Sequence, residues 1–91
     1  MDSLKEYLAE GGVVLDVRTR EEFAQGANPA AINIPVSELG SSLSRLDKAQ
    51  PVIVCCASGG RSAAARKLLM QNGFDNVLDV GPWRNSIDAA E

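Results

Sequence analysis

Two adjacent cysteines, Cys55 and Cys56, lie where a strongly apolar run meets a loop of small residues. The run 52–55 predicts a buried strand, and a helical pattern begins at Arg61, after the loop 57–60. Ligands of open α/β sheets bind at the carboxyl ends of strands. Inward-pointing N–H groups of such a loop, with the positive N-terminal end of the helix, favour an anion. A cysteine that begins this loop is therefore expected to be a reactive thiolate.

The chain contains no histidine. No imidazole is available as a catalytic base, acid or metal ligand, so the loop alone must favour the thiolate. Adjacent cysteines cannot link distant parts of a fold, and no cluster offers enough ligands for zinc. We therefore expect no zinc site, and a protein that works in a reducing compartment, the cytoplasm.

The charges are distributed unevenly along the chain. Twelve acids and nine bases give a net charge of −3, which argues against broad binding to nucleic acid or to an anionic membrane. No apolar run approaches the roughly 20 residues of a membrane helix, and the polar N-terminus is not a signal peptide. Residues 48–74 nevertheless carry four bases and no acid. Among these bases, Arg61 can present its fork of donors to an anion, whereas Arg66 and Lys67 are expected on a solvated helix face.

Apolar runs and capping residues place the loop in one α/β domain, residues 1–91, with a largely parallel sheet. Strands are predicted over residues 13–17, 31–34, 52–55 and 76–80. Helices are predicted after capping boxes at Ser3 and Thr19, from Ser37 through Leu46, and from Arg61 to Asn72. The pattern of the tail 83–91 favours neither a helix nor a strand.

Two segments resemble the signature motifs of one family. Residues 56–62, C-A-S-G-G-R-S, look like the active-site loop of rhodanese (thiosulfate sulfurtransferase) domains, often written C-R-S-G-x-R-S. The segment 15–35 resembles the other signature, D-V-R-x-x-x-E-(F/Y)-x-x-G-H-I-P-G-A-I-N-I-P, through L-D-V-R, E-E-F and A-I-N-I-P. The motifs lie in the expected order, and the resemblance runs from about Leu4 to Trp83.

The resemblance implies a rhodanese-like three-layer fold, with helices on both faces of a central, largely parallel sheet. It also implies that the Cys56 thiolate takes the outer sulfur of thiosulfate as a persulfide, a nucleophilic reaction that needs no metal or organic cofactor. The acceptor would be cyanide or a thiol, with a thioredoxin-like protein among the candidates. The catalytic residue is then Cys56, and the donor-binding residues are Ala57, Ser58, Gly59, Gly60, Arg61 and Ser62.

The spacing leaves two assignments for the nucleophile. With Cys56, Arg61 follows five positions later, a loop length that suits sulfur transfer in the family. With Cys55, the spacing becomes the C-x5-R of cysteine-dependent phosphatases. The register of Gly59 and Ser62 favours Cys56, which leaves Cys55 as a small buried strand residue.

The chain departs from the family pattern at Ala57, where many members carry arginine. With one fewer cation, we expect weaker thiosulfate binding or another donor, and a protein persulfide carrier that turns over thiosulfate poorly is the alternative. The serines Ser58 and Ser62 could donate to the bound anion or cap the following helix.

Other residues of the motifs are expected to be structural. Asp16 and Arg18 would form an ion pair, because a carboxylate within an apolar strand needs a partner. Trp83 would cover the core. Residues 27–30, A-N-P-A, replace the usual H-I-P-G, which threatens local packing more than chemistry.

Overall fold

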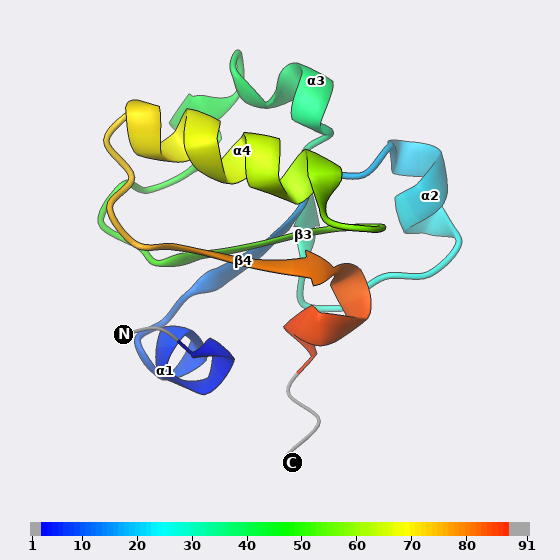
Figure 1. The fold of residues 1–91 in the computed structure, drawn as a ribbon, viewed down its shortest axis with the longest axis horizontal. Helices are drawn as coiled ribbons and strands as arrows, with labels where there is room; N and C mark the ends of the chain where they lie inside the picture. The colour runs from blue at the N-terminus through cyan, green and yellow to red at the C-terminus, as the bar shows by residue number, and fades with distance from the viewer. Residues whose placement is uncertain (1–2, 88–91) are drawn as a thin grey trace.

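The computed structural model describes residues 3–87 and has a parallel four-stranded sheet at its centre (Figure 1). The strands are β1 (Val13–Asp16), β2 (Ile32–Asn33), β3 (Val52–Cys56) and β4 (Val77–Pro82), in the spatial order β2-β1-β3-β4. Each neighbouring pair is parallel. The carboxyl ends of all four strands therefore meet at one edge of the sheet, where ligands of such sheets bind.

Helices cover both faces of the sheet and complete three layers (Figure 1). On one face lie α3 (Val36–Leu39) and α4 (Gly60–Gln71), and on the other lie α1 (Leu4–Ala9) and the 3-10 helix η2 (Trp83–Ser86). The short helix α2 (Arg20–Ala24) lies beside the carboxyl edge of the sheet. The predicted α/β architecture is confirmed.

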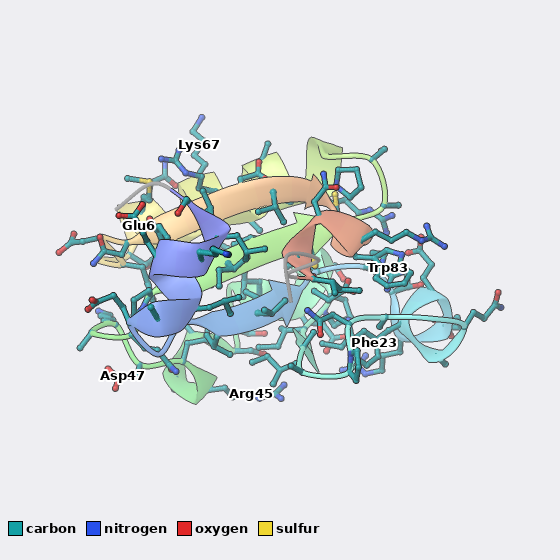
Figure 2. All side chains as sticks on the ribbon, turned by 90° about the horizontal axis from the view of Figure 1, so that it is seen from below. Glu6, Phe23, Arg45, Asp47, Lys67 and Trp83 are labelled. Atoms are coloured by element: carbon teal, nitrogen blue, oxygen red, sulfur yellow. The ribbon has the colours of Figure 1, made fainter. Side chains whose placement is uncertain are left out.

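Successive residues of the central strands supply two separate cores. Leu15 and Val54 belong to the larger core under α4, whereas Val14 and Ile53 belong to the smaller core under α1, together with Tyr7. This alternation follows from the period of two in a strand whose two faces are both covered. Figure 2, seen from the α1 side, shows β4, β3 and β1 side by side beneath that helix.

The first two helices begin as their sequences predict. The Ser3 side chain accepts from the Glu6 N–H at the start of α1. At α2, the Thr19 hydroxyl accepts from the Glu22 N–H while the Glu22 carboxylate accepts from the Thr19 N–H, which makes a complete capping box. The second box matters for the site, because it fixes the Glu22 side chain on α2.

The single helix predicted from Ser37 to Leu46 is wrong. Helix α3 ends at Leu39, and a separate 3-10 helix, η1 (Leu43–Arg45), follows. Gly40 follows Leu39, and glycine has a low helix propensity. The Ser41 hydroxyl also donates to the Glu38 carbonyl, which competes with continuation of the helix. Ser37 does not cap α3, because the helix already begins at Val36, with Pro35 in the capping position and no side-chain cap.

Strand β4 extends to Pro82, further than predicted, and contains an irregularity. Val54 pairs with Asp79, but Cys55 pairs with Gly81, so Val80 has no partner on β3. The ambiguous tail forms η2 in its first four residues, and residues 88–91 lie outside the described part. No helix within residues 3–87 is long and apolar enough to span a bilayer.

Candidate active site

Cys56 is the last residue of β3, at the carboxyl edge of the sheet. Its side chain belongs to the core under α4 and is fully buried, while Ala57, Ser58 and Gly60 of the loop that covers it are exposed. One layer of small residues therefore separates the sulfur from solvent.

Hydrogen-bond donors of the loop surround Cys56 Sγ. The Gly59 N–H donates to the sulfur at 2.9 Å. The thiol donates to Ser62 Oγ at 3.3 Å, and the Ser62 hydroxyl donates to the Gly59 carbonyl at 3.1 Å. When the thiol loses its proton, the same hydroxyl can turn and donate to the sulfur.

These donors make Cys56 more acidic than an ordinary cysteine. Burial raises its pKa, but hydrogen bonds from the Ser62 hydroxyl and from the N–H groups of Ser62, Gly59 and Ser58 outweigh burial, and the net pKa is lowered. The arrangement favours a thiolate without an imidazole, as the sequence predicts.

A glycine allows the loop to turn toward the sulfur. Gly59 has a φ of +113°, a conformation that other residues rarely adopt. It immediately precedes α4, and a Cβ added there would lie 4.0 Å from the Gly81 Cα. Gly81 itself has a φ of +73° and follows the β4 irregularity. Two glycine backbones thus lie close together at the base of the loop.

Cys55 lies on the opposite face of the sheet. It is fully buried in the smaller core with Tyr7, Val14 and Ile53. Burial, with the nearby Asp16 carboxylate as the next cause, raises the pKa of Cys55 to about 12. A neutral thiol with no exposure is unsuited to nucleophilic attack, which favours the interpretation of Cys55 as a small core residue.

Arg61 does not point its guanidinium freely toward the loop. Its two terminal nitrogens donate to the two carboxylate oxygens of Glu22, at 2.6 and 3.0 Å. Both side chains are about one-third exposed, at 35% and 37%. The expectation that Arg61 presents its donors to an anion therefore meets a competing partner that the sequence analysis did not identify. Glu22 lies 39 positions away, and neither its capping box with Thr19 nor its place in the E-E-F motif predicts this contact.

The predicted ion pair between Asp16 and Arg18 is confirmed. Arg18 Nη2 lies 2.7 Å from Asp16 Oδ2, and both side chains are buried. The same nitrogen also donates to the Gly26 carbonyl at 2.8 Å, beyond the end of α2. The pair therefore attaches α2 to the end of β1.

Trp83 covers the smaller core, as expected. Its ring lies 5.2 Å from Arg18 Cζ and 4.6 Å from Arg84 Cζ, so two guanidinium groups stack on it. Figure 2 shows Trp83 at the end of the sheet, between η2 and α2. The tryptophan stabilises this end of the fold rather than the loop around Cys56.

The altered segment 27–30 keeps its packing. Asn28 is buried, and its amide nitrogen donates to the Ser86 carbonyl and hydroxyl at 3.2 and 3.1 Å. Its side-chain oxygen accepts from the Ala30 N–H at 2.9 Å. The expected threat to local packing is therefore not observed, because Asn28 connects the segment to η2.

Neither serine of the loop caps α4 with its side chain. Gly59 occupies the capping position without a side-chain hydrogen bond, whereas the Ser62 hydroxyl lies between the sulfur and the Gly59 carbonyl. Arg66 and Lys67 are exposed, as predicted, although Arg66 Nε also donates to the Val77 carbonyl. Within residues 3–87, no three His, Cys, Asp or Glu side chains could hold a metal ion together.

Comparisons with known proteins identify relatives of the chain as a whole. The family model described as "Rhodanese-like domain" matches residues 1–81. The chain is 37% identical over 81 residues to a "Sulfurtransferase" of Allochromatium vinosum, covering 87% of this chain and 76% of that protein. It is 38% identical over 87 residues to "Thiosulfate sulfurtransferase 16, chloroplastic" of Arabidopsis thaliana, covering 82% and 72%. The solved human single-domain sulfurtransferase TSTD1 superposes with a TM-score of 0.73 at 33% identity, covering 90% of this chain and 87% of that one.

Proposed function

The chain belongs to the rhodanese-like domain family, and its sulfurtransferase relatives support sulfur transfer as the class of reaction. We propose that the chain transfers sulfur through a persulfide on Cys56. The proposed donor is thiosulfate or a related sulfane-sulfur compound, and the acceptor is cyanide or a thiol. A relative named for thiosulfate supports this donor class.

The reaction proceeds in two displacement steps. The Cys56 thiolate attacks the outer sulfur of thiosulfate, the sulfur–sulfur bond breaks, and its electron pair leaves with sulfite. The acceptor, as cyanide or a thiolate, then attacks the outer sulfur of the persulfide. This step restores the Cys56 thiolate and releases thiocyanate or a new persulfide. Neither step needs a redox or metal cofactor, because both are nucleophilic displacements.

One observation carries the proposal: the donors around Cys56 Sγ favour a negative sulfur there. The Gly59 N–H at 2.9 Å and the other donors that lower the pKa of Cys56 are fixed by the loop and the start of α4. A persulfide anion needs the same stabilisation as a thiolate. Preorganised N–H groups supply it without reorganisation during the reaction.

Intact-mass measurement tests the proposal. After incubation with thiosulfate, the protein should gain the mass of one sulfur atom and lose it on addition of cyanide. Cys56→Ser should gain nothing, whereas Cys55→Ser should load like the wild type. Sulfur loading that survives in Cys56→Ser would overturn the assignment of Cys56 as the sulfur carrier. Hydrolysis of an aryl phosphate by the wild type, abolished in Cys55→Ser, would favour a phosphatase.

A second candidate, a persulfide carrier served by a protein donor, is favoured by the charge around the loop. Between residues 57 and 62 the sole cationic side chain is Arg61, and Glu22 neutralises it. Within this loop, a dianionic donor such as thiosulfate would therefore be attracted by the helix and backbone dipoles but by no unpaired side-chain charge. Loading by a persulfidated protein thiol, with little loading by thiosulfate, would favour the carrier.

A further inference from the structure

We propose that Glu22 is a positioning residue for Cys56: by binding Arg61 it fixes the first turn of α4, so that the loop donors face the sulfur. This inference rests on the proposed use of Cys56 in sulfur transfer. It assigns Arg61 to holding the loop rather than to holding the donor anion.

The geometry of the pair suits a positioning role. Arg61 binds both Glu22 oxygens side by side, at 2.6 and 3.0 Å, which fixes orientation as well as distance. Glu22 Oε1 also accepts from the Thr19 N–H at 3.0 Å and from the Thr19 hydroxyl at 3.1 Å. The carboxylate is thus held on α2 before it meets Arg61.

Helix α2 is itself fixed by polar contacts rather than by a core of its own. It has five residues, none of them buried. Arg18 connects it to β1 through the buried Asp16, through the Gly26 carbonyl at 2.8 Å and through the Glu22 carbonyl at 3.5 Å. A continuous chain of hydrogen bonds therefore runs from the end of β1, through α2, to Arg61.

Arg61 is well placed to transmit this constraint to the sulfur. It is the second residue of α4 and lies between Gly59 and Ser62, which both contact Cys56 Sγ. A shift of the first turn would move the Gly59 N–H and the Ser62 hydroxyl away from the sulfur together. The pKa of Glu22 is lowered to about 2 by its hydrogen bonds to Arg61 and Thr19, so the pair stays ionised wherever sulfur transfer is measured.

The opposing interpretation is that Glu22 masks Arg61 from an anionic donor. The two interpretations predict opposite signs for the same substitution. If Glu22 masks, its removal frees a cation and lowers the KM for thiosulfate. If Glu22 positions, its removal displaces the loop donors, raises the pKa of Cys56 and lowers kcat.

The test is a double-mutant cycle of Glu22→Gln, Arg61→Gln and both together. Glutamine keeps one oxygen that can accept at the Thr19 cap. It removes the charge and replaces the other oxygen with an NH2 donor, so the two-bond pair with Arg61 is broken. Glu38→Gln is the matched control, because Glu38 makes a two-bond pair with Arg20 of α2, at 2.6 Å for each bond, and does not bind Arg61. The pH profile of Cys56 alkylation and the kinetics of thiosulfate loading are measured for each variant, with circular dichroism to confirm folding.

We expect Glu22→Gln and Arg61→Gln each to shift the alkylation profile about one pH unit upward and to slow sulfur loading roughly tenfold. The double variant should be no worse than either single variant, because the pair acts as one unit. Glu38→Gln should match the wild type. Arg61→Lys keeps the charge but not the two-pronged guanidinium, so its alkylation profile and loading rate should lie between those of Arg61→Gln and the wild type. It replaces Arg61→Gln in the test if that variant fails to fold.

A lower KM in Glu22→Gln, with an alkylation profile that is unchanged or shifted to lower pH, would overturn the proposal in favour of masking. A freed Arg61 cation favours the Cys56 thiolate, because the two groups interact electrostatically. Additive losses in the double variant would overturn the proposal too, because Arg61 would then act independently of Glu22. The alkylation profile needs no sulfur donor. A wild type that fails to load sulfur would therefore refute the proposed function while the positioning of Cys56 is still measured.

Discussion

Cys55 and Cys56 are consecutive residues of β3 whose side chains lie in different cores, on opposite faces of the sheet. Cys55 has Asp16 as a nearby charge, which adds to the effect of burial, whereas Cys56 has hydrogen-bond donors that counter burial. Their pKa values therefore move in opposite directions from that of an ordinary thiol. The pair provides an internal comparison of two neighbouring sulfurs with opposite reactivity.

Alkylation of the native protein should modify Cys56 alone. The lowered pKa of Cys56 gives it a larger thiolate fraction than an ordinary cysteine has at the same pH, and only the loop must move to expose it. Peptide mapping after treatment with iodoacetamide should find the label on Cys56, and the half-maximal rate should come at a lower pH than for an ordinary cysteine. Labelling of native Cys56→Ser at a comparable rate would contradict this prediction.

Cys55 should make the fold sensitive to alkaline pH. Its folded pKa, about 12, lies above the unfolded value, so burial of the neutral thiol stabilises the fold fully below about pH 8.5. That contribution is lost as pH rises toward 12, by up to about 1.4 kcal/mol per pH unit. Urea unfolding of wild type and Cys55→Ala across this range should show the difference in free energy shrinking. A constant difference would argue against a buried neutral thiol.

The Ser62 hydroxyl should account for part of the acidity of Cys56. A hydrogen bond to a charged group contributes about 1.5–3 kcal/mol, so Ser62→Ala should raise the pKa of Cys56 by about one to two units. The rate of alkylation against pH measures this shift. Ser58→Ala is the matched control, because Ser58 contributes only its backbone N–H to the sulfur. Equal alkylation profiles for the two variants would show that the Ser62 hydroxyl does not lower the pKa of Cys56.

Local patterns were sufficient to predict most of the elements that position the site. The strand before Cys56, the capping box at Thr19 and the pair of Asp16 with Arg18 depend on residues close in sequence, and each is confirmed. The partner of Arg61 could not be predicted in this way. It depends on how α2 and α4 meet in space, 39 positions apart.

The helix predicted after Ser37 shows a second limit of sequence patterns. Leucines at helical spacing continue past Gly40, but α3 ends at Leu39. Leu39 is fully buried, and Leu43 and Leu46 pack against the same core from η1 and the residue after it. Apolar spacing alone indicated which residues face the core but not whether one helix carries them.

Gly59 should link loop conformation to reactivity. Its φ of +113° strains any residue with a Cβ, although a methyl group there would meet only the Gly81 Cα, at 4.0 Å. The cost of Gly59→Ala therefore comes from the backbone, about 1–2 kcal/mol. Relief of that strain would rotate the Gly59 N–H away from Cys56 Sγ. We expect slower alkylation at neutral pH and a higher Cys56 pKa, measured by the rate of alkylation against pH.

Gly11 separates the effect of strain from the effect on the sulfur. It also has a positive φ, +82°, and a Cβ there would contact nothing within 4 Å. Gly11→Ala should therefore lose a similar amount of stability in urea unfolding, because the same left-handed backbone is strained. Since Gly11 follows α1, far along the chain from the loop, its variant should keep the wild-type alkylation profile. If both variants slow alkylation equally, global destabilisation explains the loss, and the Gly59 N–H has no specific role at the sulfur.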